Sequence, residues 1–522
     1  MLIRTIFFVA TALACTESYK ILGIFPMAGI SHYILASKLM KGLSEAGHDI
    51  TMVSPFALKD LPKKGTFTDV VLDGMFETFQ QSLIDMNLFH YGSLGPIDQE
   101  KILRQIGIAM ANDTLHHPKM VKFAASNQKF DAVIMEQFTN DALKVYGYIF
   151  DCPVILLQSM GVSSWINNIV GNAEPVSYAP QVLGVNDISK DLSFSNRAEN
   201  LYLHILNSVM TKFRLLPEHD KIIRSMYPEA PSMEDLYHNV SLVLVNSHTS
   251  IHPPLPLVPN VIEIGGYFVD PPKKLPEDLQ EYLDNAPDGV IYFSMGSNIR
   301  SKDITPEKKQ AILNVFGRLK EKVIWKFEEN LPGKPSNVMI RSWCPQQDIL
   351  AHPNVKLFIS HSGLLSITEA IYHGVPILCI PVFGDQPANA QRAVMNGYAL
   401  RMDYLDPDFN EEKLGYLVNE LLTNPTYRDT AKEKSRIYHD RPMKPMESVV
   451  YWVEYVIRHK GAPHLRVAGA LLPWYKYYMV DVLGTFVASF LLVLYILIRL
   501  IKNVLSRTKK VKTKTTKKDK KH

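Results

Sequence analysis

One histidine near the amino terminus stands where acid–base chemistry is expected. His32 follows the loop Pro26–Ser31, which itself follows a run of apolar residues at 19–25. An imidazole with an ordinary pKa near 6.5 can accept a proton from a hydroxyl group at neutral pH. Because the loop ends a predicted buried strand, His32 should open a helix at the ligand-binding edge of a sheet. We therefore consider His32 a candidate general base.

A carboxylate would complete this candidate acid–base pair. A carboxylate bound to the second imidazole nitrogen fixes the tautomer and stabilises the imidazolium that forms during proton transfer. Glu136 follows the predicted strand Asp131–Met135, and Asp141 lies five residues later in a loop that leads to a helix. The sequence does not decide between Glu136 and Asp141 as the partner of His32.

A denser set of polar residues lies in the second half of the chain. A predicted buried strand ends just before His361, and a helix begins within the next few residues, so Gly363 and Ser366 lie near its amino terminus. Free backbone N–H groups and the helix dipole favour an anion there, such as a diphosphate. Gly363 would let the backbone approach a phosphate closely. Glu369 lies on the same helical face as Ser366 and can accept hydrogen bonds from ribose hydroxyls.

The elements that position these residues form two series of alternating strands and helices. The predicted strands of the first half are 19–25, 49–53, 131–135, 154–157 and 242–246, with a helix from Ser31, its predicted cap, to about Gly47. Those of the second half are 290–294, 323–327, 338–341, 356–360 and 376–380. Seven prolines between residues 253 and 276 indicate a stiff, extended linker. This pattern predicts two doubly wound α/β domains that face a cleft with the carboxyl ends of their strands.

The two ends of the chain indicate a membrane protein. Residues 1–18 combine an early arginine, a charge-free stretch and small residues, which is typical of a secretory signal peptide. Val482–Ile498 is a stretch of seventeen uncharged residues with aromatic residues before it and lysines after it, as in a transmembrane helix. The positive-inside rule then predicts a single-pass type I protein with luminal domains and a cytoplasmic tail.

The expected organisation follows from these boundaries. The segments are a signal peptide (1–18), a first α/β domain (19–250), a linker (251–276), a second α/β domain (277–460), a juxtamembrane segment (461–479), a transmembrane helix (480–501) and a basic tail (502–522). The tail holds ten of the 56 Lys and Arg residues, so the rest of the chain is negatively charged, which excludes a basic-groove nucleic-acid binder. Lysines at 518 and 520 resemble a retrieval signal of endoplasmic-reticulum membrane proteins. Asn112 and Asn239 begin predicted glycosylation sequons.

One segment of the second half resembles the signature of the UDP-glucuronosyl and UDP-glucosyl transferase family. The matching residues, in chain order, are Trp343-x-Pro345-Gln346, His361-x-Gly363-x-x-Ser366-x-x-Glu369, Pro376 and Asp385-Gln386. The turn Ser294–Ser297 resembles the family's phosphate-contacting turn, and the motif at His361 is most similar to insect-type membrane-bound members. The chain departs from many members at Ser362, where they have glycine, and at Leu365, where they often have asparagine.

The resemblance implies a GT-B glycosyltransferase whose first domain binds the acceptor and whose second domain binds a UDP-sugar. The implied UDP-sugar contacts are Trp343 at the uracil, Gln346 near the base and ribose, Ser297, His361, Gly363 and Ser366 at the diphosphate, Glu369 at the ribose, and Asp385 and Gln386 at the sugar. By the same resemblance His32 is the catalytic base. Residues near 160–165 and 178–194 are expected to line the acceptor pocket.

The implied reaction is inverting transfer of a sugar from a UDP-sugar to a hydroxyl of a small lipophilic acceptor, such as a phenolic, pigment or xenobiotic. UDP-glucose is favoured as the donor over UDP-glucuronate. A UDP-glucuronate donor, a ceramide-like lipid acceptor, and a nucleotide-sugar-binding membrane protein without turnover are the alternatives. We expect no metal and no other cofactor, one membrane-spanning contact with the lipid bilayer of the endoplasmic reticulum, and no nucleic-acid partner. A homo-oligomer is left open.

Overall fold

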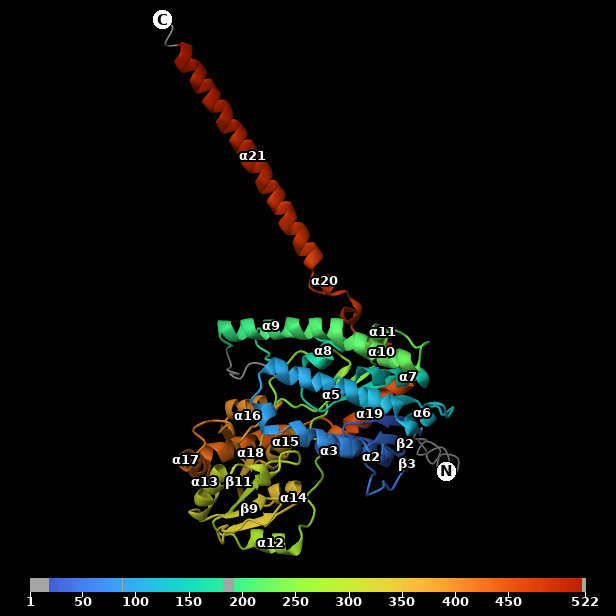
Figure 1. The fold of residues 1–522 in the computed structure, drawn as a ribbon, viewed down its shortest axis with the longest axis vertical. Coiled ribbons are helices and arrows are strands. Elements are labelled where there is room, and N and C mark those ends of the chain that lie inside the picture. Colours follow the sequence, from blue (N-terminus) through green and yellow to red (C-terminus); the bar gives the residue numbers. More distant parts are fainter. Residues whose placement is uncertain (1–17, 87, 182–191, 519–522) are drawn as a thin grey trace, which may run out of the picture. The chain divides into compact units, whose positions relative to one another are not determined.

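The computed structural model describes residues 18–86, 88–181 and 192–518. The predicted signal peptide, apart from Ser18, and the last four residues of the tail therefore lie outside the described residues. The chain separates into two units, Met1–Val467 and Ala468–His522 (Figure 1). Each unit is described by itself below.

The first unit contains two parallel β-sheets. The first sheet has seven strands in the order β3-β2-β1-β4-β5-β6-β7. These strands are β1 (Lys20–Ile24), β2 (Asp49–Ser54), β3 (Thr66–Val71), β4 (Ala132–Glu136), β5 (Val154–Gln158), β6 (Leu242–Val245) and β7 (Val261–Glu263). Helices cover both faces of the sheet, which explains why its central strands are near-continuous runs of apolar residues.

The second sheet has six strands and the same pattern of crossovers, in the order β10-β9-β8-β11-β12-β13. These strands are β8 (Val290–Ser294), β9 (Lys322–Lys326), β10 (Val338–Arg341), β11 (Val355–Ser360), β12 (Ile377–Cys379) and β13 (Ala399–Arg401). In both sheets the strand order runs outward from the first strand in two directions, which defines a doubly wound fold. The predicted fold class of two Rossmann-like sheets is confirmed.

The helices of the first half lie mainly on the two faces of the first sheet, although the short helix that contains Leu88 and Phe89 packs these residues against a core of the second half. They are α2 (Ile30–Glu45), α3 (Met75–Met86), α4 (Leu88–Gly92), α5 (Pro96–His116), α6 (Pro118–Ala124), η1 (Asp141–Lys144), α7 (Val145–Ile149), α8 (Ser164–Val170), α9 (Phe194–Met210), η2 (Thr211–Leu215), α10 (Leu216–Met226) and α11 (Met233–His238). The core on one face includes residues of α5, α7, α8, α10 and α11. The core on the other face includes residues of α2.

The helices of the second half are α12 (Glu277–Asp284), η3 (Ser301–Asp303), α13 (Pro306–Gly317), α14 (Gln346–Leu350), α15 (Leu364–His373), α16 (Gln386–Met395), α17 (Glu411–Thr423), α18 (Pro425–His439), α19 (Pro445–Arg458) and η4 (Pro463–Leu465). Helices α12, α14, α15, α16 and α18 contribute to the core on one face of the sheet. Helices α13 and α17 contribute to the core on the other face.

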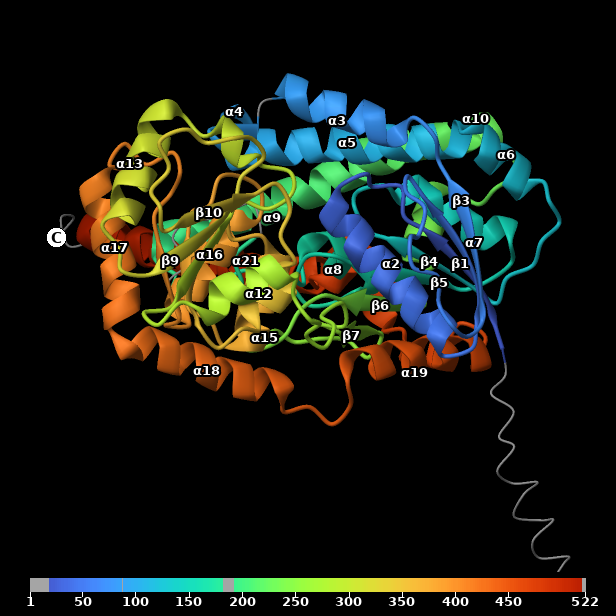
Figure 2. The ribbon, with the colours of Figure 1, turned by 90° about the horizontal axis from the view of Figure 1, so that it is seen from below.

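Helix α19 returns to the first sheet. Its residues Val449, Val453 and Val456 recur at helical spacing and are fully buried. They share a core with Leu35 of α2 and with the first sheet, and Figure 2 shows α19 beside those elements. The sequence placed this helix in the second domain, 277–460. The alternation of strands and helices does not reveal which sheet a terminal helix covers, so packing was needed to correct this boundary.

Three further details differ from the sequence prediction. The proline-rich range 251–276, predicted as a linker, contains β7, which pairs in parallel with β6 at the edge of the first sheet. The strand 242–246 is therefore not the last of its half. Ser31 does not cap its helix, because α2 begins one residue earlier with Gly29 at the cap position. Two edge strands that the sequence did not predict, β3 and β13, complete the sheets.

The second unit contains η5 (Ala468–Leu471), α20 (Trp474–Tyr477) and the long helix α21 (Val480–Lys518). Within α21, the stretch Val480–Thr508 is long and apolar enough to cross a membrane. This stretch contains the predicted transmembrane segment 480–501.

Candidate active site

The candidate site lies where the strand order reverses in each sheet. In the first sheet, His32 follows β1 and Glu136 ends the neighbouring strand β4. In the second sheet, the turn 294–297 follows β8 and His361 follows the neighbouring strand β11. Ligands of doubly wound sheets bind at this reversal point, outside the carboxyl ends of the strands. Residues of both sheets line one cleft with a volume of about 470 Å³.

His32 and Glu136 form a hydrogen-bonded pair in this cleft. The distance from Nδ1 of His32 to Oε1 of Glu136 is 2.5 Å. The Glu136 side chain is almost completely buried, whereas 20% of the His32 side chain is exposed. The edge of the imidazole also packs against the ring of Phe138. Because a carboxylate accepts the Nδ1 proton, Nε2 of His32 remains the basic nitrogen.

The electrostatic surroundings favour the protonated form of His32. Burial by itself lowers the pKa of His32, but the charge of Glu136, its hydrogen bond and the charge of Asp385 together raise this pKa above 6.5. Asp385 comes from the second half of the chain, so charges of both halves act on this imidazole. The arrangement stabilises an imidazolium that forms when His32 takes a proton.

Asp141, the other candidate partner, binds elsewhere. Its buried carboxylate forms an ion pair with Lys144 and accepts a hydrogen bond from Nε2 of Gln137 at 3.0 Å. Burial raises the pKa of Asp141, but Lys144 and His219 more than offset this effect and lower the pKa. The structure therefore brings Glu136 to His32 and leaves Asp141 in a separate buried ion pair.

The second sheet contributes the amino terminus of α15 to the cleft. Gly363 occupies the cap position, and the ring of His361 packs tightly against two glycines. A Cβ atom on Gly296 or Gly363 would lie 2.7 or 2.6 Å from Nε2 of His361, so both positions require glycine. Burial and the charge of Lys326 lower the pKa of His361 to about 4. A neutral His361 beside free helix N–H groups can donate a hydrogen bond to a phosphate.

A buried carboxylate lies behind this helix terminus. Glu369 accepts hydrogen bonds from Nε2 of Gln346 at 2.5 Å and from Nε2 of Gln347 at 3.1 Å. Nε2 of Gln346 also donates to Oγ of Ser366 at 3.0 Å. Burial raises the pKa of Glu369 to about 7 although both glutamines lower it. The predicted ribose-binding residues thus form one connected group, and Gln347 joins it.

The predicted base-stacking and sugar-binding residues also line the cleft. Trp343 is 61% exposed, so its ring is available to a flat ligand. Asp385 occupies the cap position of α16 but does not cap it, and its carboxylate accepts from Nδ2 of Asn389 at 2.7 Å. Oε1 of Gln386 accepts from the backbone N–H groups of residues 382 and 383. Only the amide nitrogen of Gln386 is therefore left for a sugar hydroxyl.

The structure places the remaining predicted residue and adds others that the sequence analysis missed. Ser297 is exposed at the cleft, after β8. Lys326 ends β9 and lines the same cleft with its Nζ 3.0 Å from Oε1 of Glu328. Its position at the carboxyl end of a strand next to β8 is the signal that could have identified it. Asn389 lies one helical turn after Asp385, which is the spacing of side chains that contact each other.

A comparison with known protein families identifies the family of this chain. The family described as UDP-glucoronosyl and UDP-glucosyl transferase matches residues 20–516. The chain belongs to this family. It is a UDP-glycosyltransferase.

The enzyme is similar to relatives named as glycosyl-, glucosyl- and glucuronosyltransferases. It is 34% identical over 485 residues to UDP-glycosyltransferase UGT5 of Dactylopius coccus, which covers 92% of this chain and 91% of the relative. It is 31% identical over 476 residues to UDP-glucuronosyltransferase 2C1 of Oryctolagus cuniculus, which covers 87% of this chain and 92% of the relative. The family is therefore shown, but these relatives do not determine the donor.

Solved structures share the fold of the enzyme. The calicheamicin glycosyltransferase CalG4 aligns with a TM-score of 0.59 and 17% identity, covering 86% of this chain and all of that chain. LpCGTa in complex with UDP aligns with a TM-score of 0.53 and 16% identity, covering 84% and 100%. At this level of identity the likeness shows the GT-B fold alone, and it confirms that prediction.

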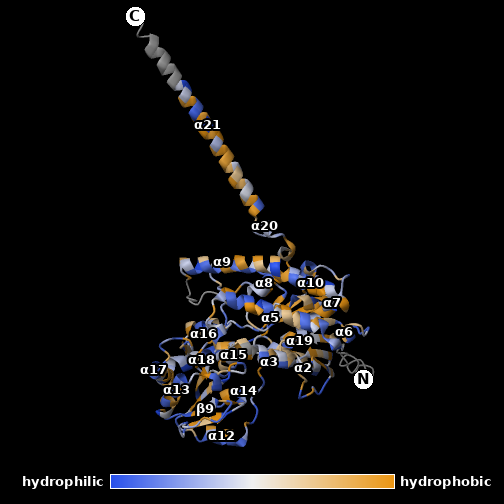
Figure 3. Cartoon of the chain, viewed as in Figure 1, coloured by the Kyte–Doolittle hydropathy of each residue, from blue (hydrophilic) through white to orange (hydrophobic). Residues whose placement is uncertain are grey.

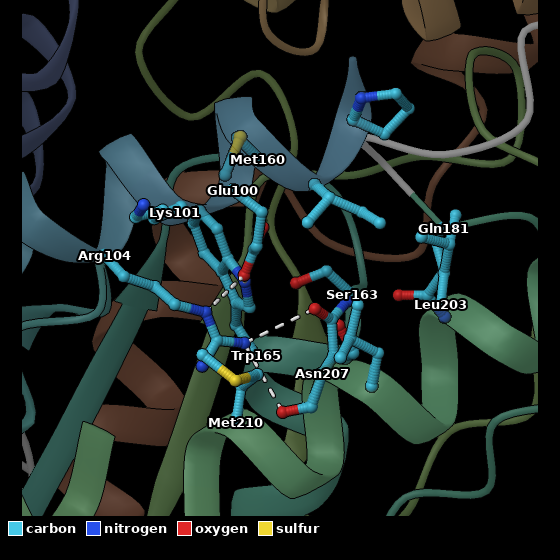
Figure 4. A pocket seen from close by; sticks show the side chains of 14 residues that line it. Glu100, Lys101, Arg104, Met160, Ser163, Trp165, Gln181, Leu203, Asn207 and Met210 are labelled. Carbon is cyan, nitrogen blue, oxygen red and sulfur yellow. Dashed lines mark hydrogen bonds and ion pairs between the residues drawn. The ribbon is translucent and has the colours of Figure 1, made fainter. Parts of the chain in front are cut away.

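A second cavity lies next to this cleft. It has a volume of about 120 Å³ and is lined by residues of α5, α8 and α9. Met160 lines both this cavity and the cleft. In Figure 4, Trp165 and Arg104 approach Glu100, which accepts from Nε1 of Trp165 at 3.1 Å and from Nε of Arg104 at 3.0 Å. Of the stretches expected to line an acceptor pocket, 160–165 lies here, whereas 182–191 is outside the described residues.

The two predicted sequons differ in their surroundings. Asn112 lies inside α5, and the hydroxyl of Thr114 is buried and donates to the backbone oxygen of Met110. Asn239 is exposed after α11, and its Oδ1 accepts from Arg466 at 3.0 Å, which leaves its amide nitrogen free, although Ser241 of the same sequon is buried like Thr114. The surroundings of Asn239 are therefore compatible with an attached glycan.

Proposed function

We propose that this enzyme transfers glucose from UDP-glucose to a hydroxyl of a small lipophilic acceptor, with inversion at the anomeric carbon. The observation that carries this proposal is the His32–Glu136 pair, which faces the amino terminus of α15 across one cleft. A base and an anion site on opposite sides of a cleft are what direct displacement of a diphosphate requires.

In the proposed reaction, Nε2 of His32 removes the proton from the acceptor hydroxyl. The acceptor oxygen forms a bond to the anomeric carbon while the bond from that carbon to the diphosphate oxygen breaks. The electron pair of the broken bond goes to the diphosphate, which leaves as UDP. Glu136 stabilises the imidazolium, and His361 with the N–H groups of α15 stabilises the leaving charge.

Charge pairing in the cleft supports glucose as the transferred sugar. Binding of a glucuronate carboxylate would require a cationic side chain that is not already paired. The described residues that line the cleft include three lysines and no arginine. Lys38 and Lys273 both pair with Asp270, and Lys326 pairs with Glu328. Each of these lysines therefore already has a carboxylate partner. Asp385 at the same cleft would accept hydrogen bonds from a neutral sugar.

The proposed acceptor site is the apolar side of the cleft and its continuation past Met160. Phe138 packs between the ring of His32 and the ring of Trp165. The cavity lined by Met160 and Trp165 then extends the cleft beyond this aromatic group. Its small volume favours a phenolic or similarly small acceptor over a ceramide-like lipid.

The proposed reaction uses no metal ion. The protein itself provides an anion-binding group for the diphosphate, the amino terminus of α15. The acidic triplet Asp406-Pro407-Asp408 does not line the cleft, and Asp406 accepts from Nζ of Lys413 at 2.6 Å. Initial rates measured with and without EDTA test this part of the proposal, and we expect them to be equal.

The decisive experiment offers UDP-glucose and UDP-glucuronate separately to membranes that contain the enzyme, with a panel of phenolic acceptors. Product masses identify the transferred sugar. We expect a hexose adduct that disappears in His32→Ala and persists in the matched control His116→Ala, whose side chain is outside the cleft. A glucuronide would overturn the donor assignment. UDP binding without any product would favour the non-catalytic alternative.

We also propose that the first unit lies in the lumen of the endoplasmic reticulum and that α21 spans the membrane once. The apolar stretch Val480–Thr508 and the lysine-rich end of the chain support this orientation. Protease protection in intact microsomes tests it. The first unit should resist digestion until detergent is added, and digestion without detergent would contradict the proposed orientation.

A further inference from the structure

Helix α9 presents an apolar face to solvent. Large apolar side chains that are 44–81% exposed recur along α9 and η2, namely Phe194, Leu201, Tyr202, Ile205, Val209 and Phe213. Figure 3 shows apolar residues along α9. Their spacing places the residues of α9 on one side of the helix. A surface helix normally turns such a stripe toward a protein core, so this face is suited to a partner outside the described fold.

The opposite face of α9 already has its own packing. Leu203, Leu206, Asn207 and Met210 line the cavity next to the catalytic cleft. On the same face Asn200, Leu203 and His204 are buried, and the Asn200 side chain bonds to the backbone of residues 176, 179 and 181, which attaches α9 to the first unit. The exposed stripe is a second apolar face, and it is not needed to attach α9 to the first unit.

The chain itself determines what lies close to this unit. Only residues 468–479 separate the first unit from α21, whose stretch Val480–Thr508 is apolar enough to cross a membrane. At about 3.5 Å per extended residue, this connection keeps Val467, the end of the first unit, within ~40 Å of the start of α21. A bilayer spanned by α21 would thus be a large apolar phase close to the first unit at all times.

We propose that α9 lies in the interfacial layer of the same bilayer that α21 spans, with its exposed stripe among the headgroups and upper acyl chains. Helices that lie in a membrane interface have one apolar face with aromatic and aliphatic side chains and do not need to span. Phe194, Tyr202 and Phe213 provide the aromatic groups, which favour the headgroup region. The inference does not depend on which sugar or acceptor the enzyme uses.

Photo-crosslinking to lipid tests this contact with the full-length chain. The enzyme is reconstituted in phosphatidylcholine vesicles that contain a diazirine phosphatidylcholine, irradiated and digested, and lipid adducts are located by peptide mass. Peptides of α21 should be labelled in every sample and serve as the internal standard. We expect additional adducts within residues 194–213, and none on α17, where Tyr416 is an equally exposed aromatic residue.

Variants separate lipid contact from general exposure. The double variant Ile205→Ser, Val209→Ser should lower the labelling of α9 at least fivefold relative to α21 and leave UDP binding unchanged. The matched control Tyr416→Ser should leave the labelling of α9 unchanged. Labelled α21 with unlabelled α9 would overturn the proposal. Crosslinks between α9 segments of two molecules, without lipid adducts, would also overturn it and assign the stripe to a second copy of the chain.

Discussion

Replacing Glu136 by glutamine tests the proposed catalytic pair most directly. The substitution keeps the size of the side chain and removes its charge. In the wild type, an imidazolium at His32 would form an ion pair with Glu136, with nitrogen and oxygen 2.5 Å apart. For charge centres about 4 Å apart and an effective permittivity of about 20, the Coulomb energy is about 4 kcal/mol. The neutral glutamine amide still interacts with the imidazolium through its dipole and so keeps part of this Coulomb energy. We therefore expect kcat/KM to fall 10²–10³-fold, which corresponds to about 3–4 kcal/mol.

The pH dependence distinguishes this electrostatic effect from misfolding. A general base must be neutral, so kcat/KM falls as pH drops through the pKa of His32. Glu136 and Asp385 raise that pKa above 6.5 in the wild type. Removing the charge of Glu136 should lower the pKa, and the acidic limb of the profile should move to lower pH. The assay measures initial rates of product formation from pH 5 to 9, with UDP affinity as a check on the fold.

The rival carboxylate provides the control. In Asp141→Asn, the acidic limb should stay at its wild-type position, because Asp141 pairs with Lys144 and not with His32. The reasoning is refuted if Glu136→Gln keeps its activity within threefold of wild type. It is also refuted if Asp141→Asn, and not Glu136→Gln, moves the acidic limb.

Three other expectations concern residues around this pair. UDP binding should release up to about one proton below pH 7, because ribose hydroxyls that donate to Glu369 would lower its raised pKa, which is about 7. Titration calorimetry in buffers of different ionisation enthalpy measures this release. A binding enthalpy that does not depend on the buffer would contradict it. Asp141→Asn should lower the free energy of unfolding by about 3–5 kcal/mol, because it leaves the buried Lys144 without a counter-charge. The double variant with Lys144→Met should recover most of the lost free energy of unfolding in a denaturant titration. A double variant as unstable as Asp141→Asn alone would argue against the ion pair as the cause. Asn239→Gln should remove an endoglycosidase-sensitive mass shift that Asn112→Gln leaves in place, and the reverse result would contradict the assigned glycan position.

The parts of the site that could be predicted from sequence are those fixed by backbone topology. Strands buried between two helical layers are recognisable as apolar runs, and the polar residues that follow them must collect at one edge of the sheet. This reasoning placed His32 and His361 at the two reversal points. It could not choose between Glu136 and Asp141, because Glu136 ends β4, Asp141 follows it closely, and the choice depends on which side chain points at the imidazole. Here the deciding factor is Lys144, which sequesters Asp141.

The elements that escaped prediction lack a strong local signal. Strand β3 is an edge strand whose six residues include three polar side chains, Thr66, Thr68 and Asp69. Strand β7 has three residues and lies within a proline-rich stretch, where local composition indicates a linker. The position of α19 on the first sheet depends on long-range packing. In each case the missing information is tertiary, since the same residues would be compatible with another local structure.

The segment 382–386 connects the two halves at the reaction centre. Gln99 of α5 accepts a hydrogen bond from the backbone N–H of Gly384 at 3.3 Å, and Gly92 lies so close that a Cβ atom there would be 2.2 Å from the oxygen of Val382. The same segment presents Asp385, whose charge acts on His32. A sugar that bound Asp385 would therefore change the electrostatic field at His32, and the backbone contacts of the same segment would transmit its position to the first half. The position of His32 is set by Glu136 within the first half, whereas its pKa also depends on Asp385 of the second half, so the strength of the proposed base is sensitive to what binds on the other side of the cleft.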